Sequence, residues 1–246
     1  MVKYIDLNCD VGEGVGNEKY LFPYISSCNI ACGGHAGDSS SMQQIAGLAK
    51  KYNVKVGAHP SYPDKENFGR ASMDITSDAL IESIQDQIAS LASILEEQNI
   101  PLHHIKAHGA LYNEIAAEVA LAACFLEAIG AYKDTVSLYV PPVSEIEKIA
   151  VGRGFSIRYE VFGDRNYNDD LSLVSRKHPD ALIQSPEAVL QHIVQMAKTQ
   201  KVKTLTAKSV KILAETFCIH SDTPSAIEIV MYLSRQLPNH NIQIEK

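Results

Sequence analysis

The sequence has no long apolar stretch and no excess of positive charge. No window approaches the roughly 18 consecutive apolar residues that a membrane-spanning helix needs, and the 246-residue chain carries a formal net charge of −7. Nucleic acids and anionic membranes bind basic surfaces, so neither is expected as a partner. The N-terminal segment MVKYIDLNCD also lacks the basic start and the apolar centre of a signal peptide.

Cysteine is scarce as well. The five cysteines are an odd number and are scattered over positions 9, 28, 32, 124 and 218. A chain of this length buries enough apolar surface to fold without disulfides. Cys28 and Cys32 supply at most half of a zinc site, and their position in one β-rich run favours packing. Free thiols in a reducing, cytoplasmic compartment are therefore expected.

Linkers, internal repeats and low-complexity tracts are also missing, so residues 1–246 are expected to form a single α/β domain. What the sequence does contain is an alternation of short β-rich runs and amphipathic helical runs. Strands separated by helices pair in parallel through right-handed crossovers, which gives either a barrel or a doubly wound sheet. The expected strands are 4–9, 28–32, 54–58, 103–107, 137–140, 155–162 and 214–219.

Several helical runs have clear features. Apolar residues recur at helical spacing through residues 80–95, and Thr76 is the expected N-cap. Residues 111–129 are unusually apolar and are expected to form a helix that packs on the barrel or in a contact between subunits. Residues 201–213 interrupt the alternation, and their two short alternating pieces predict an antiparallel hairpin.

Polar and ionisable side chains gather where the expected strands end. In α/β barrels the carboxyl ends of the strands share one face, and catalytic residues come from several of them. Asp38 and Asp222 precede helical runs and are expected to be N-caps if they are not functional. A single histidine at a strand end is usually structural, but similar residues at six strand ends favour a functional site. The residues are Asn8, Asp10, Glu13, Cys32, His35, Asp38, His59, Lys106, His108, Glu160, Asp164, Arg165, His220 and Asp222.

Two loops and one residue triad suggest ligands. Residues 33–38 form a glycine-rich turn before a helix that could bind an anion, although the turn matches no nucleotide-binding motif. Arg70, in a proline-containing loop, either binds a carboxylate or phosphate or is solvated. Asp10, His35 and His59 could form a two-histidine, one-carboxylate metal site, but no metal is the favoured interpretation.

Seven blocks of the sequence resemble one family. They are DLNCDVGEG (6–14), SCNIACGGHAGD (27–38), VGAHPSYPD (56–64), FGR (68–70), KAHGALYN (106–113), EVFGDRNY (160–167) and CIHSDTP (218–224). In this order they resemble the LamB/YcsF family, which is the family of the A subunit of 5-oxoprolinase, from residue 6 to about residue 237. The chain departs from the family pattern at Gly34, Ala107 and Gly163, among other positions, but the charged and histidine positions are retained.

The resemblance implies a distorted, seven-stranded, TIM-like (β/α) barrel related to the glycoside hydrolase and polysaccharide deacetylase group. It also implies ATP-dependent hydrolysis of 5-oxo-L-proline (pyroglutamate) to L-glutamate, with release of ADP and phosphate, in a complex with 5-oxoprolinase subunits B and C. Direct ATP binding by this chain, a bound divalent metal and a homo-oligomer are left open. The alternatives are a metal-dependent, deacetylase-like amidohydrolase acting on a small amide or carbohydrate, and a scaffolding protein without catalytic residues.

Opening a stable lactam needs a stronger electrophile, an activated water and protonation of the leaving nitrogen. We expect Asp10 or Glu160 to be the general base and His59 or His108 to transfer the proton. Lys106 and Arg165 are expected to bind the substrate carboxylate or the phosphorylated oxygen. The predicted catalytic residues are Asp10, His59, Lys106, His108 and Glu160, and the predicted substrate-binding residues are Asn29, His35, Arg70, Asn113, Asp164, Arg165 and His220.

Overall fold

The computed structural model describes residues 2–246 and contains a closed barrel of seven parallel strands. The ring closes because the last strand of the barrel pairs with both the sixth and the first. This confirms the predicted α/β barrel. The strands are β1 (Lys3–Val11), β2 (Ser27–Ala31), β3 (Lys55–His59), β4 (Leu102–Ile105), β5 (Ser137–Val140), β6 (Ile157–Phe162) and β9 (Thr216–Cys218).

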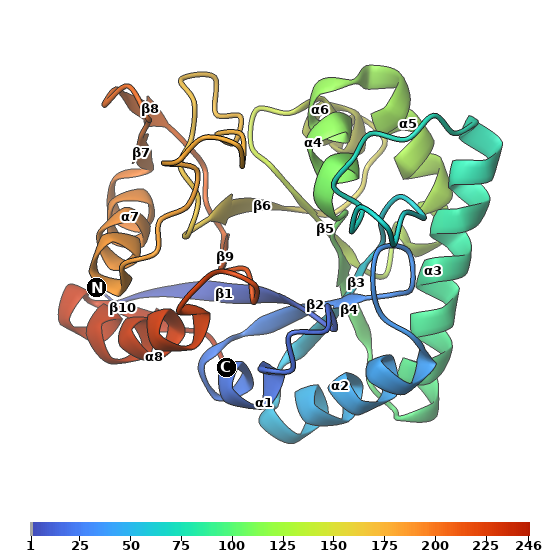
Figure 1. The fold of residues 1–246 in the computed structure, drawn as a ribbon, viewed down its shortest axis with the longest axis horizontal. Helices are drawn as coiled ribbons and strands as arrows, with labels where there is room; N and C mark the ends of the chain where they lie inside the picture. The colour runs from blue at the N-terminus through green and yellow to red at the C-terminus, as the bar shows by residue number, and fades with distance from the viewer. Residues whose placement is uncertain (1) are drawn as a thin grey trace.

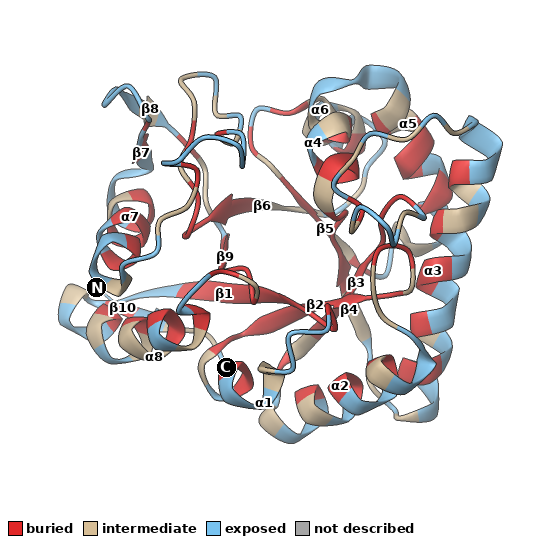
Figure 2. Ribbon diagram, viewed as in Figure 1, coloured by how far each residue is buried: buried red, intermediate tan, exposed pale blue. Residues whose placement is uncertain are grey.

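Helices surround the strands (Figure 1), and their buried faces are turned towards the barrel while their outer faces are exposed (Figure 2). The α-helices are α1 (Glu18–Leu21), α2 (Ser39–Tyr52), α3 (Ser77–Glu97), α4 (Gly109–Ala117), α5 (Val119–Ala128), α6 (Glu145–Gly152), α7 (Pro186–Thr199) and α8 (Ala226–Gln236). Short 3₁₀ helices cover Phe22–Tyr24, Gly130–Tyr132 and Leu237–His240. Not one helix in residues 2–246 is long and apolar enough to cross a membrane.

Strand β1 shows how the barrel acquires a polar interior. Successive side chains of a strand point to opposite faces, and β1 alternates apolar with polar residues. One set packs in the hydrophobic core, and the other points into the barrel. All six side chains are at most 2% exposed: Ile5, Leu7 and Cys9 on the core side, and Asp6, Asn8 and Asp10 inside.

The polar side chains inside the barrel are joined by hydrogen bonds. Near the amino ends of the strands, Asp6 Oδ1 accepts from Ser27 Oγ at 2.7 Å and from Thr216 Oγ1 at 2.6 Å. One layer higher, Asn8 Nδ2 donates to Thr216 Oγ1 at 2.7 Å and to Glu160 Oε1 at 3.0 Å. Burial of these groups is tolerated because they are paired, and the network extends to the carboxyl ends of the strands.

Two expectations about helices are corrected. The expected helix at 111–129 is two helices, α4 and α5, because Glu118 between them has extended backbone angles (φ −115°, ψ 114°). Helix α4 packs on α6, whereas α5 packs on α3 and α6, and a continuous apolar sequence does not reveal such a corner. Asp222 is not an N-cap, since Ser225 precedes α8 and Asp222 instead accepts from Arg70 Nη2 at 2.6 Å.

Other local expectations are confirmed. Asp38 caps α2 by accepting from Ser41 N at 2.8 Å, and Thr76 caps α3. The hairpin exists as β7 (Lys201–Lys203) and β8 (Ser209–Lys211). The five cysteines are buried and free. The sequence interpretation missed a short last strand, β10 (Ile242–Ile244), which pairs in parallel with the start of β1.

Candidate active site

A cavity of about 660 Å³ lies at the carboxyl ends of the barrel strands. Its volume is within the range of roughly 300–1,000 Å³ that is usual for small-molecule sites. All five predicted catalytic residues line it, and so do four of the seven predicted substrate-binding residues, namely Arg70, Asn113, Arg165 and His220. Asn29, His35 and Asp164 lie behind the cavity wall. The face chosen from the sequence is therefore the face that holds the cavity.

A buried ammonium group lies between two carboxylates at the base of the cavity. Lys106 Nζ is 2.8 Å from Asp10 Oδ1, 2.9 Å from Glu160 Oε1 and 3.2 Å from Cys218 Sγ. Burial alone would lower the pKa of Lys106, but the charges of Asp10 and Glu160 raise it well above its ordinary value. Lys106 therefore stays charged and balances one of the two carboxylates.

Asp10 and Glu160 differ in their surroundings. Burial favours a higher pKa for Asp10, but His59 and Lys106 hold it well below its ordinary value. Burial raises the pKa of Glu160, and Lys106 offsets only part of this shift. Two carboxylates whose pKa values are pushed apart take different roles in acid–base chemistry. Asp10 stays ionised, while Glu160 is the one suited to exchanging a proton.

Asn29 explains why Asp10 is fixed in place. Its Nδ2 donates to Asp10 Oδ1 at 2.7 Å and to Asn8 Oδ1 at 2.8 Å, and its Oδ1 accepts from His104 Nε2 at 2.7 Å. Gly57 leaves the space for His104, since a Cβ there would lie 2.2 Å from the imidazole ring. These hydrogen bonds indicate a positioning role for Asn29 beneath the cavity.

Two buried polar atoms of the cavity wall have no hydrogen-bond partner within residues 2–246. They are Glu160 Oε2 and the hydroxyl of Tyr112, and both residues line the cavity. Burial raises the pKa of Tyr112, and so does the Glu160 side chain, both through its charge and because it lies close to the phenol, so the phenol is protonated. Unsatisfied buried polar atoms are rare and costly in folded proteins. At this position they offer a ligand one acceptor and one hydroxyl donor.

His220 is oriented by Asp164. The Asp164 carboxylate accepts from the His220 backbone N–H at 2.9 Å, from His220 Nδ1 at 3.0 Å and from Thr223 Oγ1 at 2.6 Å. Burial favours a higher pKa for Asp164, but His220 and the other donors hold it below its ordinary value. An ionised carboxylate that accepts from Nδ1 leaves Nε2 of the same ring available for proton transfer. His220 Nε2 lies 3.9 Å from Asp10 Oδ2 at the cavity wall.

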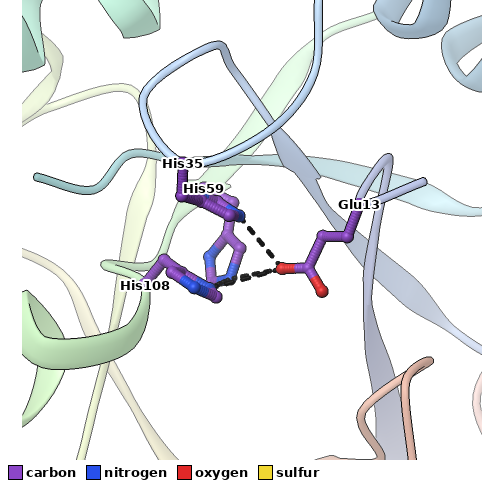
Figure 3. Close-up of side chains that lie close together, drawn as sticks. All are labelled: Glu13, His35, His59 and His108. Atoms are coloured by element: carbon purple, nitrogen blue, oxygen red, sulfur yellow. Dashed lines mark hydrogen bonds and ion pairs between the residues drawn. The ribbon is translucent and has the colours of Figure 1, made fainter. Parts of the chain in front are cut away.

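Three histidines and a glutamate form a second cluster beside Asp10 (Figure 3). Glu13 Oε1 is 3.0 Å from His35 Nε2, 3.3 Å from His108 Nδ1 and 3.9 Å from His59 Nε2. The rings of His35 and His108 are stacked, with centroids 3.6 Å apart. Burial lowers the pKa of His35, and it lowers that of His108 strongly. The sequence offered Asp10, His35 and His59 as a possible metal site, although no metal was the favoured interpretation, and the structure groups the two histidines with Glu13 and His108.

The loop after β3 covers this cluster and requires glycine. Gly69 has φ +62°, and a Cβ there would lie 2.9 Å from His35 Cβ. Gly109, at the start of α4, has φ +60°, and its Cβ would lie 2.3 Å from Gly69 O. A left-handed backbone in close contact with its neighbours favours glycine at both positions. The sequences FGR and HGA therefore bring the loop and α4 together over the histidines.

Basic side chains surround the rest of the cavity. Arg70 pairs with Asp222, and Arg165 donates from Nη2 to Val174 O at 2.7 Å. Arg176 and Lys177 contribute to the lining as well. An anion that enters the cavity therefore meets positive charge at its rim.

The sequence interpretation assigned no role to Tyr112, and Glu13 was named among the strand-end residues but not among the predicted catalytic or substrate-binding residues. Tyr112 lies in KAHGALYN on the first turn of α4, four residues after His108, which is the N-cap of that helix, and this closeness to a predicted catalytic residue was a usable signal. Glu13 was recognised at a strand end, but only the path of its loop brings it to the histidines.

Three comparisons with known proteins point to the same family. The profile of the LamB/YcsF family matches residues 5–246. A protein from Thermococcus sibiricus named as the A subunit of 5-oxoprolinase is 40% identical over 245 residues, which cover 98% of this chain and 96% of that protein. The crystal structure of a lactam utilization protein from Thermus thermophilus is similar with a TM-score of 0.91 and 32% identity, covering 98% of this chain and 99% of that one.

Proposed function

The chain belongs to the LamB/YcsF family, and on that premise we propose that it is the A subunit of an ATP-dependent 5-oxoprolinase. It then acts with partner subunits B and C to hydrolyse 5-oxo-L-proline to L-glutamate, with cleavage of ATP to ADP and phosphate. The name of the relative from Thermococcus sibiricus supports the activity. The cavity supports the substrate class.

The main support for the proposal is the presence of two buried atoms in the cavity wall without hydrogen-bond partners in the described part of the chain, Glu160 Oε2 and the Tyr112 hydroxyl. A lactam presents one N–H donor and one C=O acceptor on neighbouring ring atoms. Glu160 Oε2 supplies the acceptor and the Tyr112 hydroxyl supplies the donor, so both buried atoms become satisfied when a lactam binds. The substrate also carries a carboxylate, which suits the arginines and lysines that line the same cavity.

The reaction consumes one lactam, one ATP and two waters. The amide oxygen takes the γ-phosphoryl group of ATP, and ADP leaves. One water adds to the former carbonyl carbon and loses a proton, the C–N bond breaks as the ring nitrogen gains a proton, and an acyl phosphate results. The second water converts the acyl phosphate to the carboxylate and inorganic phosphate. A single lactam leaves part of the cavity free, so there is room for the phosphoryl group.

The surroundings of each residue suggest its role. Glu160, whose pKa is raised, is the general base that takes the proton of the attacking water. Lys106 stabilises the negative charge that develops on oxygen in the transition state. His220, oriented by Asp164, gives a proton to the ring nitrogen. We assign this role to His220 and not to His59 or His108, because His108 Nδ1 lies 3.0 Å from His59 Nε2 and 3.3 Å from Glu13 Oε1, and His59 Nε2 also lies 3.4 Å from Asp10 Oδ2.

Reconstitution tests the proposal. Glutamate and ADP formation from 5-oxo-L-proline and ATP is measured with subunits B and C, with and without this chain. We expect turnover only when all three proteins, the lactam and ATP are present. Full activity of B and C alone would leave this chain no catalytic part. Glutamate formation without ATP would instead favour a simple amidohydrolase.

Tyr112→Phe tests whether the Tyr112 hydroxyl donates a hydrogen bond to the lactam. Loss of one hydrogen bond to an uncharged group costs about 1.4 kcal/mol, so we expect kcat/KM for 5-oxo-L-proline to fall about tenfold. Tyr132→Phe is the matched control, because Tyr132 lies in a 3₁₀ helix and does not line the cavity. Equal kinetics for the two variants would remove Tyr112 from the binding site.

A further inference from the structure

The side chains of Glu13, His35, His59 and His108 come from the ends of four successive strands, β1 to β4. They are 8%, 2%, 1% and 4% exposed, respectively. One ligand atom from each lies within 4.8 Å of the ligand atoms of the other three (Figure 3). We call these four residues the Glu13–histidine cluster. His59 and His108 also line the cavity, which gives the cluster an entry path.

The hydrogen bonds around His35 fix the position of its ring proton. Ser61 Oγ donates its proton to Tyr62 O at 2.8 Å, so it acts as an acceptor towards His35 Nδ1 at 3.0 Å. Gln87 holds Ser61 in place through the Ser61 backbone N–H and C=O. The proton of His35 is therefore on Nδ1, and its Nε2 presents a lone pair to Glu13 Oε1.

Backbone carbonyls fix the other two histidines in the same way. His59 Nδ1 donates to Lys106 O at 2.9 Å, and His108 Nε2 donates to Phe68 O at 3.0 Å. A carbonyl oxygen only accepts, so these nitrogens carry the ring protons. The remaining nitrogens, His59 Nε2 and His108 Nδ1, lie 3.0 Å apart. Two neutral rings would bring two lone pairs together at this distance.

With all three rings neutral, three lone pairs and one carboxylate oxygen lie 3.0–3.9 Å from their neighbours in the cluster. The rings of His35 and His108 are stacked, so one of them has to tilt before both lone pairs can point at the same ion. A positive charge makes these contacts attractive, and either a metal ion or an additional ring proton supplies it; His59 Nε2 also lies 3.4 Å from Asp10 Oδ2. The only nearby ammonium group among the described side chains is Lys106, whose contacts are with Asp10, Glu160 and Cys218. Histidines that bind a metal through one nitrogen usually donate the other N–H to a carbonyl or similar acceptor, as all three do here.

We propose that the Glu13–histidine cluster binds one divalent transition-metal ion of the zinc class, through Glu13 Oε1, His35 Nε2, His59 Nε2 and His108 Nδ1. Tetrahedral zinc sites place ligand atoms about 3.4 Å apart, from metal–ligand distances of about 2.1 Å. Four separations among these atoms run from 3.0 to 3.9 Å and bracket that value. Three nitrogens and one carboxylate oxygen suit zinc or a similar ion better than magnesium or calcium.

The neighbouring group of Asp10, Cys218 and His220 is not the metal site. Its ligand atoms also lie close together, but Lys106 Nζ is 2.8 Å from Asp10 Oδ1 and 3.2 Å from Cys218 Sγ. The ammonium group already supplies the cation there. Burial also raises the pKa of the Cys218 thiol well above its ordinary value, which disfavours the thiolate that a metal needs.

The metal site goes beyond the proposed function and does not depend on it, because metal binding is measured on this chain alone, without lactam, ATP or partners. The purified full chain is stripped with chelator and titrated with Co²⁺ and then Zn²⁺. We expect one equivalent of Co²⁺ per chain, with the visible absorption of a tetrahedral site, and displacement of Co²⁺ by one equivalent of Zn²⁺. A chain that binds neither ion at micromolar concentrations near pH 7.5 overturns the proposal, since a proton then occupies the cluster.

Variants locate the site. The paired substitution His35→Gln with His108→Gln should abolish the Co²⁺ spectrum, and Glu13→Gln should weaken Co²⁺ binding at least tenfold. His192→Gln is the matched control, because His192 is another buried histidine and lies outside the cluster. Zn²⁺ should raise the Tm of the wild type and of the control but not that of the paired variant. An unchanged Co²⁺ spectrum in the folded paired variant, or its loss in the control, would place the metal elsewhere.

Discussion

Lys106 is the residue on which the electrostatics of the site depend most. Its ammonium group contacts two buried carboxylates and a buried thiol, and its side chain is 2% exposed. Removal of one partner from a buried ion pair leaves an uncompensated charge, which costs more than the pair contributes. Asp10 and Glu160 would both be left without their cation.

Lys106→Met should therefore abolish 5-oxo-L-proline turnover in the three-subunit complex and lower the free energy of unfolding by about 3–5 kcal/mol. Urea titration of the isolated chain gives the stability, and glutamate formation gives the turnover. Lys148→Met is the control, because Lys148 pairs with Glu145 at 2.7 Å on the exposed surface of α6, where ion pairs contribute less than about 1 kcal/mol. A fully active Lys106→Met complex would contradict the assigned role.

His192 determines part of the pH dependence of stability. It is 8% exposed, and its Nε2 is buried without a partner among the described residues. Burial lowers the pKa of His192 to about 4, whereas an unfolded histidine has a pKa of about 6.5. Between these values the unfolded chain takes up a proton that the folded chain excludes. The stability contributed by the neutral ring is thus complete above pH 6.5 and is lost as the pH falls towards 4.

Between pH 7 and pH 5 this difference amounts to about 2 kcal/mol. We expect the free energy of unfolding of the wild type to fall by about 2 kcal/mol more over this interval than that of His192→Gln. Urea titrations of both proteins at the two pH values measure the difference. The other histidines are the same in both chains, so their contributions cancel. Parallel pH profiles would show that His192 keeps an ordinary pKa in the folded protein.

Among the structural elements, the loop between β3 and α3 has the closest connection with the site. Phe68 O accepts from His108, Gly69 O accepts from Ala110 N at 2.9 Å, and Arg70 reaches Asp222. The loop therefore joins the Glu13–histidine cluster, the start of α4 and the segment before α8. Its conformation depends on Gly69, where any side chain meets both a positive φ and the His35 side chain.

Gly69→Ala should lower the free energy of unfolding by about 1–3 kcal/mol, from backbone strain and the contact with His35. It should also weaken Co²⁺ binding, because the new Cβ would lie 2.9 Å from His35 Cβ and 3.1 Å from His108 Cδ2, and both side chains must shift away from it. Gly152→Ala is the matched control, since a Cβ there meets no atom within 4 Å and Gly152 ends α6. Thermal unfolding and Co²⁺ titration of both variants provide the measurements. Wild-type behaviour of Gly69→Ala would mean that the loop is free to adjust.

Some structural elements could be predicted from the sequence, and others could not. Alternating strands and helices predicted a parallel α/β fold, and polar residues at strand ends predicted the face of the cavity, because both follow from local periodicity. The choice of a barrel over a doubly wound sheet came from the family resemblance. The corner at Glu118 and the added strand β10 depend on long-range packing, which periodicity does not report. Tyr112 was missed for a similar reason, since an aromatic residue on an apolar helix resembles core packing until the cavity beside it is known.

In the whole molecule, one end of the barrel holds the cavity, and the other end is where the C-terminal residues pack. The cavity lies at the carboxyl ends of the strands, whereas β10 pairs with β1 at Lys3–Ile5, at the amino end. Several contacts hold the C-terminal residues there. Glu245 O accepts from Ser26 Oγ at 2.8 Å, Lys246 Nζ donates to Ile25 O at 2.8 Å, and Ile242 is fully buried.

Deletion of residues 242–246 should therefore lower stability without changing the chemistry. The loss of several hydrogen bonds and of the buried Ile242 side chain should cost about 4 kcal/mol, and the exposed edge of β1 should promote aggregation on heating. At a temperature where the truncated chain is folded, kcat/KM in the complex should stay within about twofold of the wild type. Lys246→Ala is the control and should show only a small loss of Tm. A large fall in kcat/KM of the folded truncated chain would instead show that the ends are coupled. The hydrogen bonds from Asp6 through Thr216 and Asn8 to Glu160 would then be the route.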